Sequence, residues 1–338
     1  MRAIVLGERR VDIRQFPDPH PGSNEVVIEV KASALCRSDL SIYHGEPVLG
    51  EKKEEVIAGH EPCGVITEVG SNVKNLKEGE RVAVYLALGC GQCKYCRSGY
   101  LIHCPEWKCL GFDVHGGDAD LLVVPVENCL RMPNEMSFVE GALSTDKAGT
   151  LYHAIKRLGV SGRDKVAIFG AGPMGGTGLL IAKAFGATVY VVDLVKSRLG
   201  LMKELGADQQ INADQHDPVE IIQDLTKGEG VDVVIDCSGN PIAQNNALNS
   251  VKRMGRVAFI GESKKTTINP SDQIIRKQLS IIGSWYFNIS EYDEITQFIV
   301  EKELPLEKLV THRFKLDEAA KAFKMFDERK TTISVFVW

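Results

Sequence analysis

The fold of the second half of the chain is decided by one stretch, Val166-Ala-Ile-Phe-Gly170-Ala-Gly172-Pro-Met-Gly175. An apolar strand, Val166–Phe169, leads directly into the spacing G-x-G-x-x-G, after which a helix-like segment begins. The first glycine allows a tight turn, the second lets a pyrophosphate approach the backbone, and the third lets the helix pack on the strand. Phosphates would lie at the helix N-terminus, where free N–H groups and the helix dipole favour negative charge. The stretch therefore predicts a dinucleotide site formed by Gly170, Gly172, Pro173, Met174 and Gly175.

An acidic residue at the end of the next strand indicates which dinucleotide is bound. Asp193 ends the apolar run Val189-Tyr-Val-Val-Asp193. A carboxylate at this place hydrogen-bonds the ribose hydroxyls of NAD and repels the 2′-phosphate of NADP. Asp193 could instead only cap a helix that begins at Lys196, and Lys196 and Arg198 could tolerate some phosphate. We expect NAD, with Asp193 and Arg198 at the site.

The surrounding sequence predicts two kinds of architecture. From about residue 150, helix-like segments alternate with apolar strands at Val166–Phe169, Thr188–Val192, Val231–Ile235 and Arg256–Ile260. This alternation predicts βαβ units and a parallel sheet. Residues before about 145 form short runs separated by Gly, Pro and Asn, which predicts a β-rich barrel-like domain, and the closing strand Ile333–Trp338 resembles that first block. We therefore expect an α/β protein in which a Rossmann-type parallel-sheet domain (148–290) is inserted into a β-rich domain (1–147 and 291–338).

Four cysteines form the strongest metal motif of the chain. Cys90, Cys93, Cys96 and Cys104 fall within fifteen residues. Four thiolates on a short loop can surround one Zn²⁺ as a closed tetrahedral site, which has no open position for chemistry. Disulfides would need an oxidising compartment, and the total of nine cysteines is odd. We predict a structural zinc in a lobe at about 88–106.

The bulk composition limits the classes of partner. A hydrophobic content of 44% and a charged content of 25% are typical of a soluble globular protein. The formal net charge of −5 argues against a nucleic-acid partner, which needs a basic face. No apolar run approaches the roughly 18 residues of a membrane helix, and the N-terminus becomes charged too early for a secretory signal. We expect a cytoplasmic homodimer or homotetramer that acts on a small molecule and has no membrane partner.

A second group of metal-ligand residue types lies upstream of the cysteine lobe. Cys36 and Ser38 follow the strand-like run Val27–Ala32, and His60 and Glu61 precede the next apolar run. A single Cys or His is more often structural than catalytic. In a chain with a nicotinamide site, Cys36 and His60 together indicate a catalytic metal, because hydride transfer from an alcohol needs a Lewis acid that lowers the pKa of the hydroxyl. Zinc with three protein ligands and one exchangeable position meets that need.

The ordered set of motifs resembles the zinc-dependent medium-chain alcohol dehydrogenase family, in its sorbitol/polyol and secondary-alcohol branch. The resemblance covers essentially the whole chain and rests on Cys36-Arg-Ser-Asp39, Gly59-His-Glu61, the cysteine lobe, the glycine stretch and the closing β-rich segment. It implies a GroES-like catalytic domain, an NAD-binding Rossmann domain and two zinc ions per chain. It also implies that Cys36 and His60 ligate the catalytic zinc, while Glu61 either ligates the ion or swings in as water exchanges.

One ligand position departs from the better-known members of the family. Counting back from Gly170 by the family spacing reaches Asp146, where primary alcohol dehydrogenases have Cys and many polyol dehydrogenases have Glu. An Asp there resembles the secondary-alcohol branch, and oxygen ligation leaves zinc a harder, stronger Lewis acid. Asp146 could instead only cap a helix over Lys147–Leu158.

The proton relay departs from the family as well. Ser38 occupies the place of the family's relay hydroxyl, but the usual next relay, a His, is Ser41 here. His44, three residues further on, is the candidate to replace it.

The expected activity is hydride transfer between NAD and a secondary alcohol, a polyol or a sugar hydroxyl. Two alternatives stay open, a zinc-free quinone or enoyl reductase of the same superfamily and a non-enzymatic, zinc-stapled nucleotide-binding redox sensor. The first alternative explains the glycines but not Cys36, His60, Asp146 or the cysteine lobe. Metal content separates the three, with two zinc ions for the dehydrogenase, none for the reductase and one for the sensor.

Overall fold

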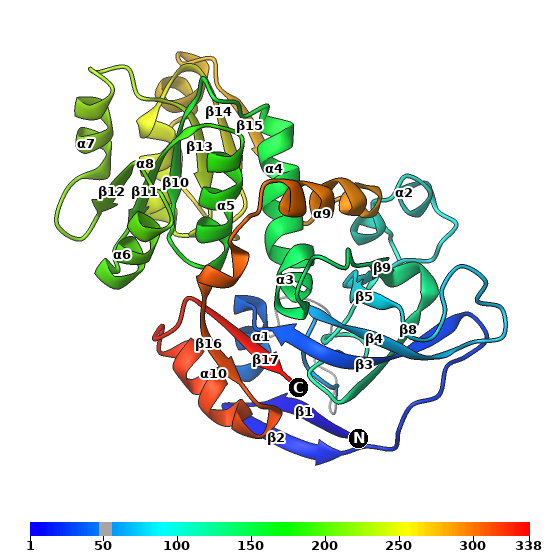
Figure 1. Ribbon diagram of the computed structural model, residues 1–338. Coiled ribbons are helices and arrows are strands. Elements are labelled where there is room, and N and C mark those ends of the chain that lie inside the picture. The colour runs from blue at the N-terminus through cyan, green and yellow to red at the C-terminus, as the bar shows by residue number, and fades with distance from the viewer. Residues whose placement is uncertain (47–55) are drawn as a thin grey trace. The chain divides into compact units, whose positions relative to one another are not determined.

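The chain divides into two compact units (Figure 1). The computed structural model describes residues 1–46 and 56–338. Unit 1 comprises Met1–Asp146, Asn288–Glu301 and Val310–Trp338, and unit 2 comprises Lys147–Phe287 and Lys302–Leu309. Nothing in the sequence pattern predicts that residues 302–309 belong to unit 2. The domain boundaries after residues 147 and 290 stay a prediction, because a compact unit need not be an independently folding domain.

Unit 1 is β-rich. Its main sheet has the strand order β16-β17-β3-β4-β5-β9, and β8 pairs with β3 beside this path. These strands are β3 (Glu25–Ala34), β4 (Pro62–Val69), β5 (Arg81–Val84), β8 (Leu121–Pro125), β9 (Cys129–Arg131), β16 (Val310–Phe314) and β17 (Ile333–Val337). The smaller sheets are β1 (Arg2–Gly7) with β2 (Arg10–Gln15), and β6 (Ala87–Leu88) with β7 (Lys108–Cys109).

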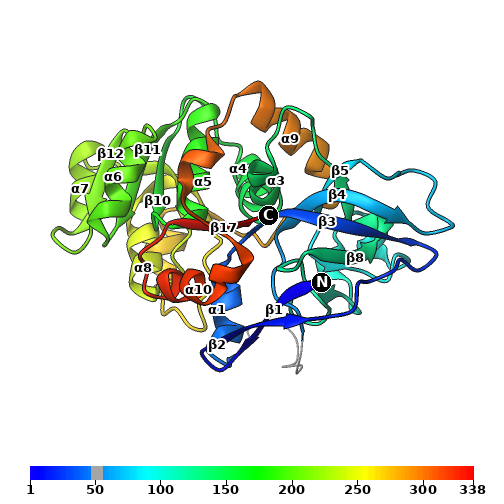
Figure 2. The same ribbon diagram turned by 60° about the horizontal axis from the view of Figure 1, so that its bottom comes forward.

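The closing strand of the chain completes this sheet, as the sequence predicts. β17 pairs antiparallel with β3, with Val335 opposite Ala34 (Figure 2). Apolar side chains of β17 and of the helix α10 (Ala319–Asp327) share one core, in which Phe323 and Phe336 pack with Leu35. The other helices of unit 1 are α1 (Arg37–Tyr43), α2 (Lys94–Arg97), α3 (Phe138–Leu143) and α9 (Tyr292–Glu301).

Unit 2 is a doubly wound parallel sheet, which confirms the predicted fold class. Its strand order is β12-β11-β10-β13-β14-β15, and every neighbouring pair is parallel. The strands are β10 (Lys165–Phe169), β11 (Thr188–Asp193), β12 (Gln209–Asn212), β13 (Val231–Asp236), β14 (Val251–Phe259) and β15 (Ser280–Gly283). The connecting helices are α4 (Thr150–Leu158), α5 (Pro173–Ala184), α6 (Lys196–Glu204), α7 (Pro218–Leu225) and α8 (Pro241–Ser250).

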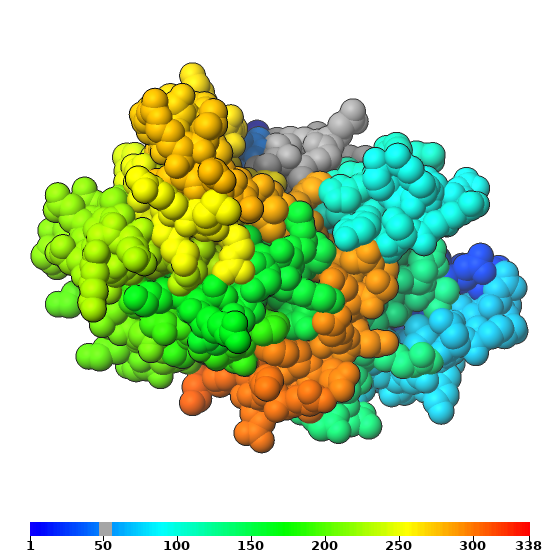
Figure 3. All heavy atoms as spheres, turned by 90° about the horizontal axis from the view of Figure 1, so that it is seen from above, coloured from blue at the N-terminus to red at the C-terminus, as the bar shows by residue number. Residues whose placement is uncertain are grey.

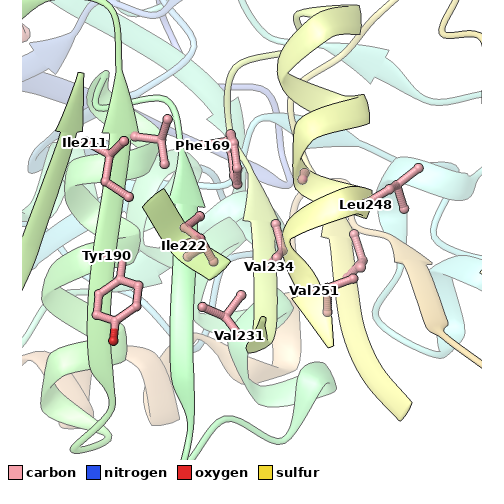
Figure 4. Packing of buried hydrophobic residues seen from close by; sticks show 12 residues of the cluster. Phe169, Tyr190, Ile211, Ile222, Val231, Val234, Leu248 and Val251 are labelled. Carbon is pink, nitrogen blue, oxygen red and sulfur yellow. The ribbon is translucent and has the colours of Figure 1, made fainter. Parts of the chain in front are cut away.

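The strand order of unit 2 indicates the edge of the sheet at which a ligand would bind. The chain runs outward from β10 through β11 to β12 and then returns to β13 beside β10. Ligands of such sheets bind at the carboxyl ends of the strands where the order reverses. Below that edge the strands are apolar because both faces are covered. Figure 4 shows Phe169 of β10, Val234 of β13, Ile222 of α7 and Leu248 of α8 in the same buried cluster.

No helix in the described ranges is long and apolar enough to cross a membrane.

Candidate active site

The four cysteines of the lobe come together as predicted. Each offers one sulfur, and these atoms all lie within 4.8 Å of one another in Cys90, Cys93, Cys96 and Cys104. Backbone N–H groups point at the sulfurs, since Cys96 N lies 3.4 Å from Cys93 Sγ and Cys90 N lies 3.4 Å from Cys104 Sγ. The bond from the Cys96 backbone lowers the pKa of Cys93 to about 7. Four sulfur donors in this arrangement fit a structural zinc.

The lobe is fastened to the segment that leads into α9. Asn288 Nδ2 donates to Ser98 O at 2.7 Å, and Ile289 N donates to Gly99 O at 2.9 Å. A Cβ on Gly99 would lie 2.0 Å from Asn288 Oδ1, so the two segments are in close contact. Figure 3 shows the cyan lobe beside the orange α9 segment. Disorder of the lobe would therefore also disturb Asn288–Glu301, the segment with which the chain returns to unit 1.

A second quartet of ligand-type side chains forms elsewhere in unit 1. The quartet consists of Cys36, His60, Glu61 and Asp146, whose ligand atoms all lie within 4.8 Å of one another. Cys36 Sγ lies 3.4 Å from Asp146 Oδ2, and His60 Nε2 lies 3.9 Å from Glu61 Oε1 and 4.0 Å from Asp146 Oδ2. Zinc–sulfur and zinc–nitrogen or –oxygen bonds of about 2.3 and 2.0 Å place tetrahedral ligands roughly 3.3–3.6 Å apart. The donor set and its spacing thus fit a zinc ion with little rearrangement.

Three separate segments bring this quartet together. Cys36 follows β3 as the N-cap of α1, and His60 and Glu61 directly precede β4. Asp146 lies in a π-helical turn, Ser144–Gly149, between α3 and α4. The N-cap of α4 is Gly149, so the interpretation of Asp146 as a helix cap is wrong. Such π turns occur frequently at functional sites.

Asp39 orients two of the four side chains. Its carboxylate accepts hydrogen bonds from His60 Nδ1 at 2.9 Å and from Cys36 N at 2.8 Å, and the residue is 1% exposed. A carboxylate only accepts, so His60 donates through Nδ1 and keeps Nε2 for a metal. Burial lowers the pKa of His60, but the charge and hydrogen bond of Asp39 outweigh burial and raise this pKa well above its usual value. Asp39 follows Cys36 by three residues, a capping-box spacing that accounts for the bond from Cys36 N, but no local spacing indicates the contact with His60.

The two predicted relay residues have different surroundings. Ser38 Oγ lies 3.4 Å from His60 Nε2, which places the hydroxyl beside the quartet. His44 Nε2 lies 2.8 Å from Asp327 Oδ1 of α10. No hydrogen bond joins Ser38 and His44 among the described residues, and the relay through His44 stays a prediction.

The glycine stretch of unit 2 forms a cradle. A Cβ on Gly175 would lie 1.7 Å from Gly170 O, so only glycine allows α5 to approach β10 this closely. A Cβ on Gly172 would meet nothing nearer than Arg198 Nη1 at 3.9 Å, which leaves space for a ligand against the backbone. Pro173 and Met174 open α5, and its N-cap, Gly172, supplies no side-chain hydrogen bond. The free N–H groups of this helix terminus fit a pyrophosphate.

Asp193 lies at the carboxyl end of β11 and holds the glycine stretch. Its Oδ2 accepts from Ala171 N at 2.6 Å, and its Oδ1 accepts from Val195 N at 2.8 Å. The N-cap of α6 is Val195, so the interpretation of Asp193 as the cap of this helix is wrong. Arg198 lies in the first turn of α6 and is half-buried. An acid and a base therefore flank the same glycine loop.

Comparison with known proteins gives matches over the whole chain. The alcohol dehydrogenase GroES-like domain family matches residues 22–134, and the zinc-binding dehydrogenase family matches residues 173–301. YphC of Escherichia coli (strain K12), an uncharacterized zinc-type alcohol dehydrogenase-like protein, is 36% identical over 98% of this chain and 96% of its own. L-threonine 3-dehydrogenase of Pyrococcus horikoshii is 34% identical over 94% of this chain and 92% of its own. The crystal structure of galactitol-1-phosphate dehydrogenase from Escherichia coli has a TM-score of 0.91 at 26% identity and covers 100% of both chains.

The chain belongs to the zinc-dependent medium-chain alcohol dehydrogenase family. Its β-rich unit carries the GroES-like domain and its parallel-sheet unit the dinucleotide fold of this family. The protein is an oxidoreductase that uses zinc and NAD and transfers a hydride between NAD and an alcohol or polyol. Membership of this family favours the interpretation as a dehydrogenase over a zinc-free reductase or a non-enzymatic sensor.

Substitution of one cysteine in each metal group should separate structural from catalytic zinc. Cys93→Ser should lower the melting temperature by on the order of 10 °C, because structural zinc contributes folding free energy directly. Cys36→Ser should abolish turnover and shift the melting temperature by no more than about 3 °C, because the rest of unit 1 keeps its packing. Thermal melts with parallel zinc analysis test both variants. Equal losses of stability would contradict this division.

Proposed function

We propose that the Cys36, His60, Glu61 and Asp146 quartet holds the catalytic zinc and that the four-cysteine lobe holds a structural one. The observation that supports this most is the convergence of one thiol, one imidazole and two carboxylates within 4.8 Å. We further propose that the glycine stretch with Asp193 and Arg198 binds NAD. The reaction is then the oxidation of a secondary alcohol, a polyol or a sugar hydroxyl to a ketone or aldehyde.

The side chains in and beside the quartet have separate roles in the proposed reaction. A bound zinc ion would act as a Lewis acid that lowers the pKa of a substrate hydroxyl. The four protein donors would complete a tetrahedral set around a zinc ion, and we propose Glu61 as the donor that would withdraw to open a position. Ser38 Oγ, 3.4 Å from His60 Nε2, is placed to relay the hydroxyl proton, taking it up as its own proton passes to water. Asp39 keeps Nε2 of His60 directed at the ion.

The proposed substrate class follows from the ligand set. Two carboxylate ligands and one thiolate make a harder site than two thiolates, and a carboxylate in place of the second Cys is typical of the secondary-alcohol and polyol branch. The names of two relatives agree with this class, since L-threonine 3-dehydrogenase and galactitol-1-phosphate dehydrogenase both denote substrates that carry hydroxyl groups on a short carbon chain.

A substrate screen tests the proposed function. The zinc-loaded enzyme should form NADH with short secondary alcohols, polyols or sugars and should use NAD in preference to NADP, because the Asp193 carboxylate repels the 2′-phosphate. The measurement is NADH or NADPH absorbance over a panel that also contains primary alcohols and quinones. Reduction of quinones alone, or a preference for NADP, would contradict the proposal.

Asp146 offers the sharpest test of the catalytic ligand set. Asp146→Asn keeps the shape of the side chain but replaces a charged zinc ligand with a neutral, poorer one. We expect loss of one zinc ion per chain and at least about a 100-fold fall in kcat. Asp317→Asn, a change at a side chain that is 70% exposed, is the matched control and should alter neither quantity. Full activity of Asp146→Asn with two zinc ions bound would remove Asp146 from the site.

We also propose that the chain assembles with copies of itself in the cytoplasm. β15 is the outer strand of the unit 2 sheet, and Met254, Ile275 and Trp285 are large apolar residues with exposures of 67%, 66% and 41% in the same part of the chain. An open strand edge near exposed apolar side chains favours pairing with a second copy. Sedimentation velocity should give the mass of two or four chains, and cell fractionation should place the protein in the cytoplasm. A monomer at micromolar concentration would contradict the assembly.

A further inference from the structure

Asp236 is a completely buried acid at the ligand edge of the unit 2 sheet. It is the last residue of β13 and is 0% exposed, and the strand that precedes it is mainly apolar. A buried carboxylate is costly unless hydrogen bonds surround it. The proposed zinc and hydride chemistry makes no use of this group, so its presence needs a separate reason.

Hydrogen bonds to Asp236 join three segments. Its Oδ1 accepts from Ser238 N at 3.0 Å and from Ser238 Oγ at 2.6 Å. Its Oδ2 accepts from Gln244 Nε2 of α8 at 3.0 Å and from Gly239 N at 3.3 Å. Its backbone carbonyl accepts from Ile260 N and Gly261 N, both at 2.9 Å. One residue therefore ties together the loop after β13, the helix α8 and the loop after β14.

The segment held by Asp236 packs directly against the glycine cradle. A Cβ on Gly170 would lie 3.1 Å from Ser238 N, which puts the loop after β13 in contact with the first glycine of the stretch. The two loops also touch each other closely, because a Cβ on Gly261 would lie 2.1 Å from Gly239 N. The backbone at Gly239 has φ +63°, a conformation that glycine adopts readily. With so little free space, a change in the Asp236 bonds has to move the wall beside Gly170.

We propose that Asp236 is a positioning residue of the dinucleotide site. It fixes the wall formed by Ser238 and Gly239 against Gly170 before the ligand arrives, so that binding does not have to order this loop. The inference rests on the proposed NAD site in unit 2 and adds a residue that does not itself have to touch the dinucleotide. Preorganisation of this kind acts on the affinity for the dinucleotide rather than on the hydride step.

Asp232 at the other end of the same strand provides a matched control. Its carboxylate is also well bonded, since Oδ2 accepts from Lys165 N at 2.7 Å and Oδ1 lies 2.5 Å from Lys252 Nζ. It lies at the amino end of β13, away from the carboxyl edge where the glycine cradle is. A purely structural role for the hydrogen-bonded acids of β13 would make the two positions behave alike, although the Asp232 side chain is 20% exposed.

The experiment measures NADH affinity by fluorescence titration of the zinc-loaded wild type, Asp236→Asn and Asp232→Asn, with melting temperatures in parallel. Asp236→Asn should raise the Kd for NADH by about tenfold, because a charge-assisted acceptor is lost from the loop. The KM for NAD should rise in parallel while kcat at saturating NAD stays within about twofold. Asp232→Asn should leave the Kd within about twofold of the wild type, whatever it does to the melting temperature.

The outcomes separate the inference from the function on which it rests. Equal Kd values for the wild type and Asp236→Asn, or equal increases in both Asp variants, would overturn the positioning role and leave the NAD site standing. A wild type that binds no NADH would overturn the site and the inference together. If Asp236→Asn does not fold, Gln244→Met removes one of the same bonds from α8, and an unchanged Kd in that variant would also overturn the role.

Discussion

Electrostatic repulsion within the quartet is the physical constraint that unit 1 has to overcome to place these four side chains together. Cys36, Glu61 and Asp146 carry acidic groups whose ligand atoms lie within 4.8 Å of one another, and the Asp39 carboxylate lies directly behind His60. Two like charges about 4 Å apart repel by roughly 4 kcal/mol at an effective dielectric constant of 20. Burial and the neighbouring Asp146 raise the pKa of the Cys36 thiol, so the metal-free group resists ionisation. A divalent cation bound there would offset this repulsion and favour the ionised thiolate of Cys36.

The architecture of unit 1 serves to hold these charges in place. β3 ends at the start of α1 and delivers Cys36, while the antiparallel neighbour β4 begins directly after Glu61. Asp39 binds the backbone of one ligand and the side chain of another, so a displacement of α1 moves both. The structural lobe stabilises the same unit from another side, because Asn288 and Ile289 fasten it to the segment before α9. In unit 2, Asp193 and Asp236 hold the loops at the carboxyl edge of the parallel sheet.

Local spacing in the sequence was sufficient to predict the fold class and to select the four cysteines of the lobe, whereas selection of the second quartet also needed the family resemblance. The glycine stretch and the cysteine lobe are short-range patterns, in which covalent geometry already limits where the side chains can lie. Asp146 needed the family spacing, and its π turn could not be predicted because that turn depends on how α3 and α4 pack. The contact of Asp39 with His60, the pairing of His44 with Asp327 and the bonds from Ile260 and Gly261 to Asp236 join segments distant in sequence, which no short motif encodes. The same applies to residues 302–309, which belong to unit 2 although the segments on either side belong to unit 1.

X-ray absorption at the zinc edge, combined with zinc analysis of the purified chain, tests the central claim most directly. Two zinc ions per chain should share five sulfur donors and three nitrogen or oxygen donors, because four sulfurs come from the lobe and one from Cys36, with His60, Glu61 and Asp146 supplying the rest. A single zinc ion with four sulfur donors, or a chain without zinc, would contradict the account.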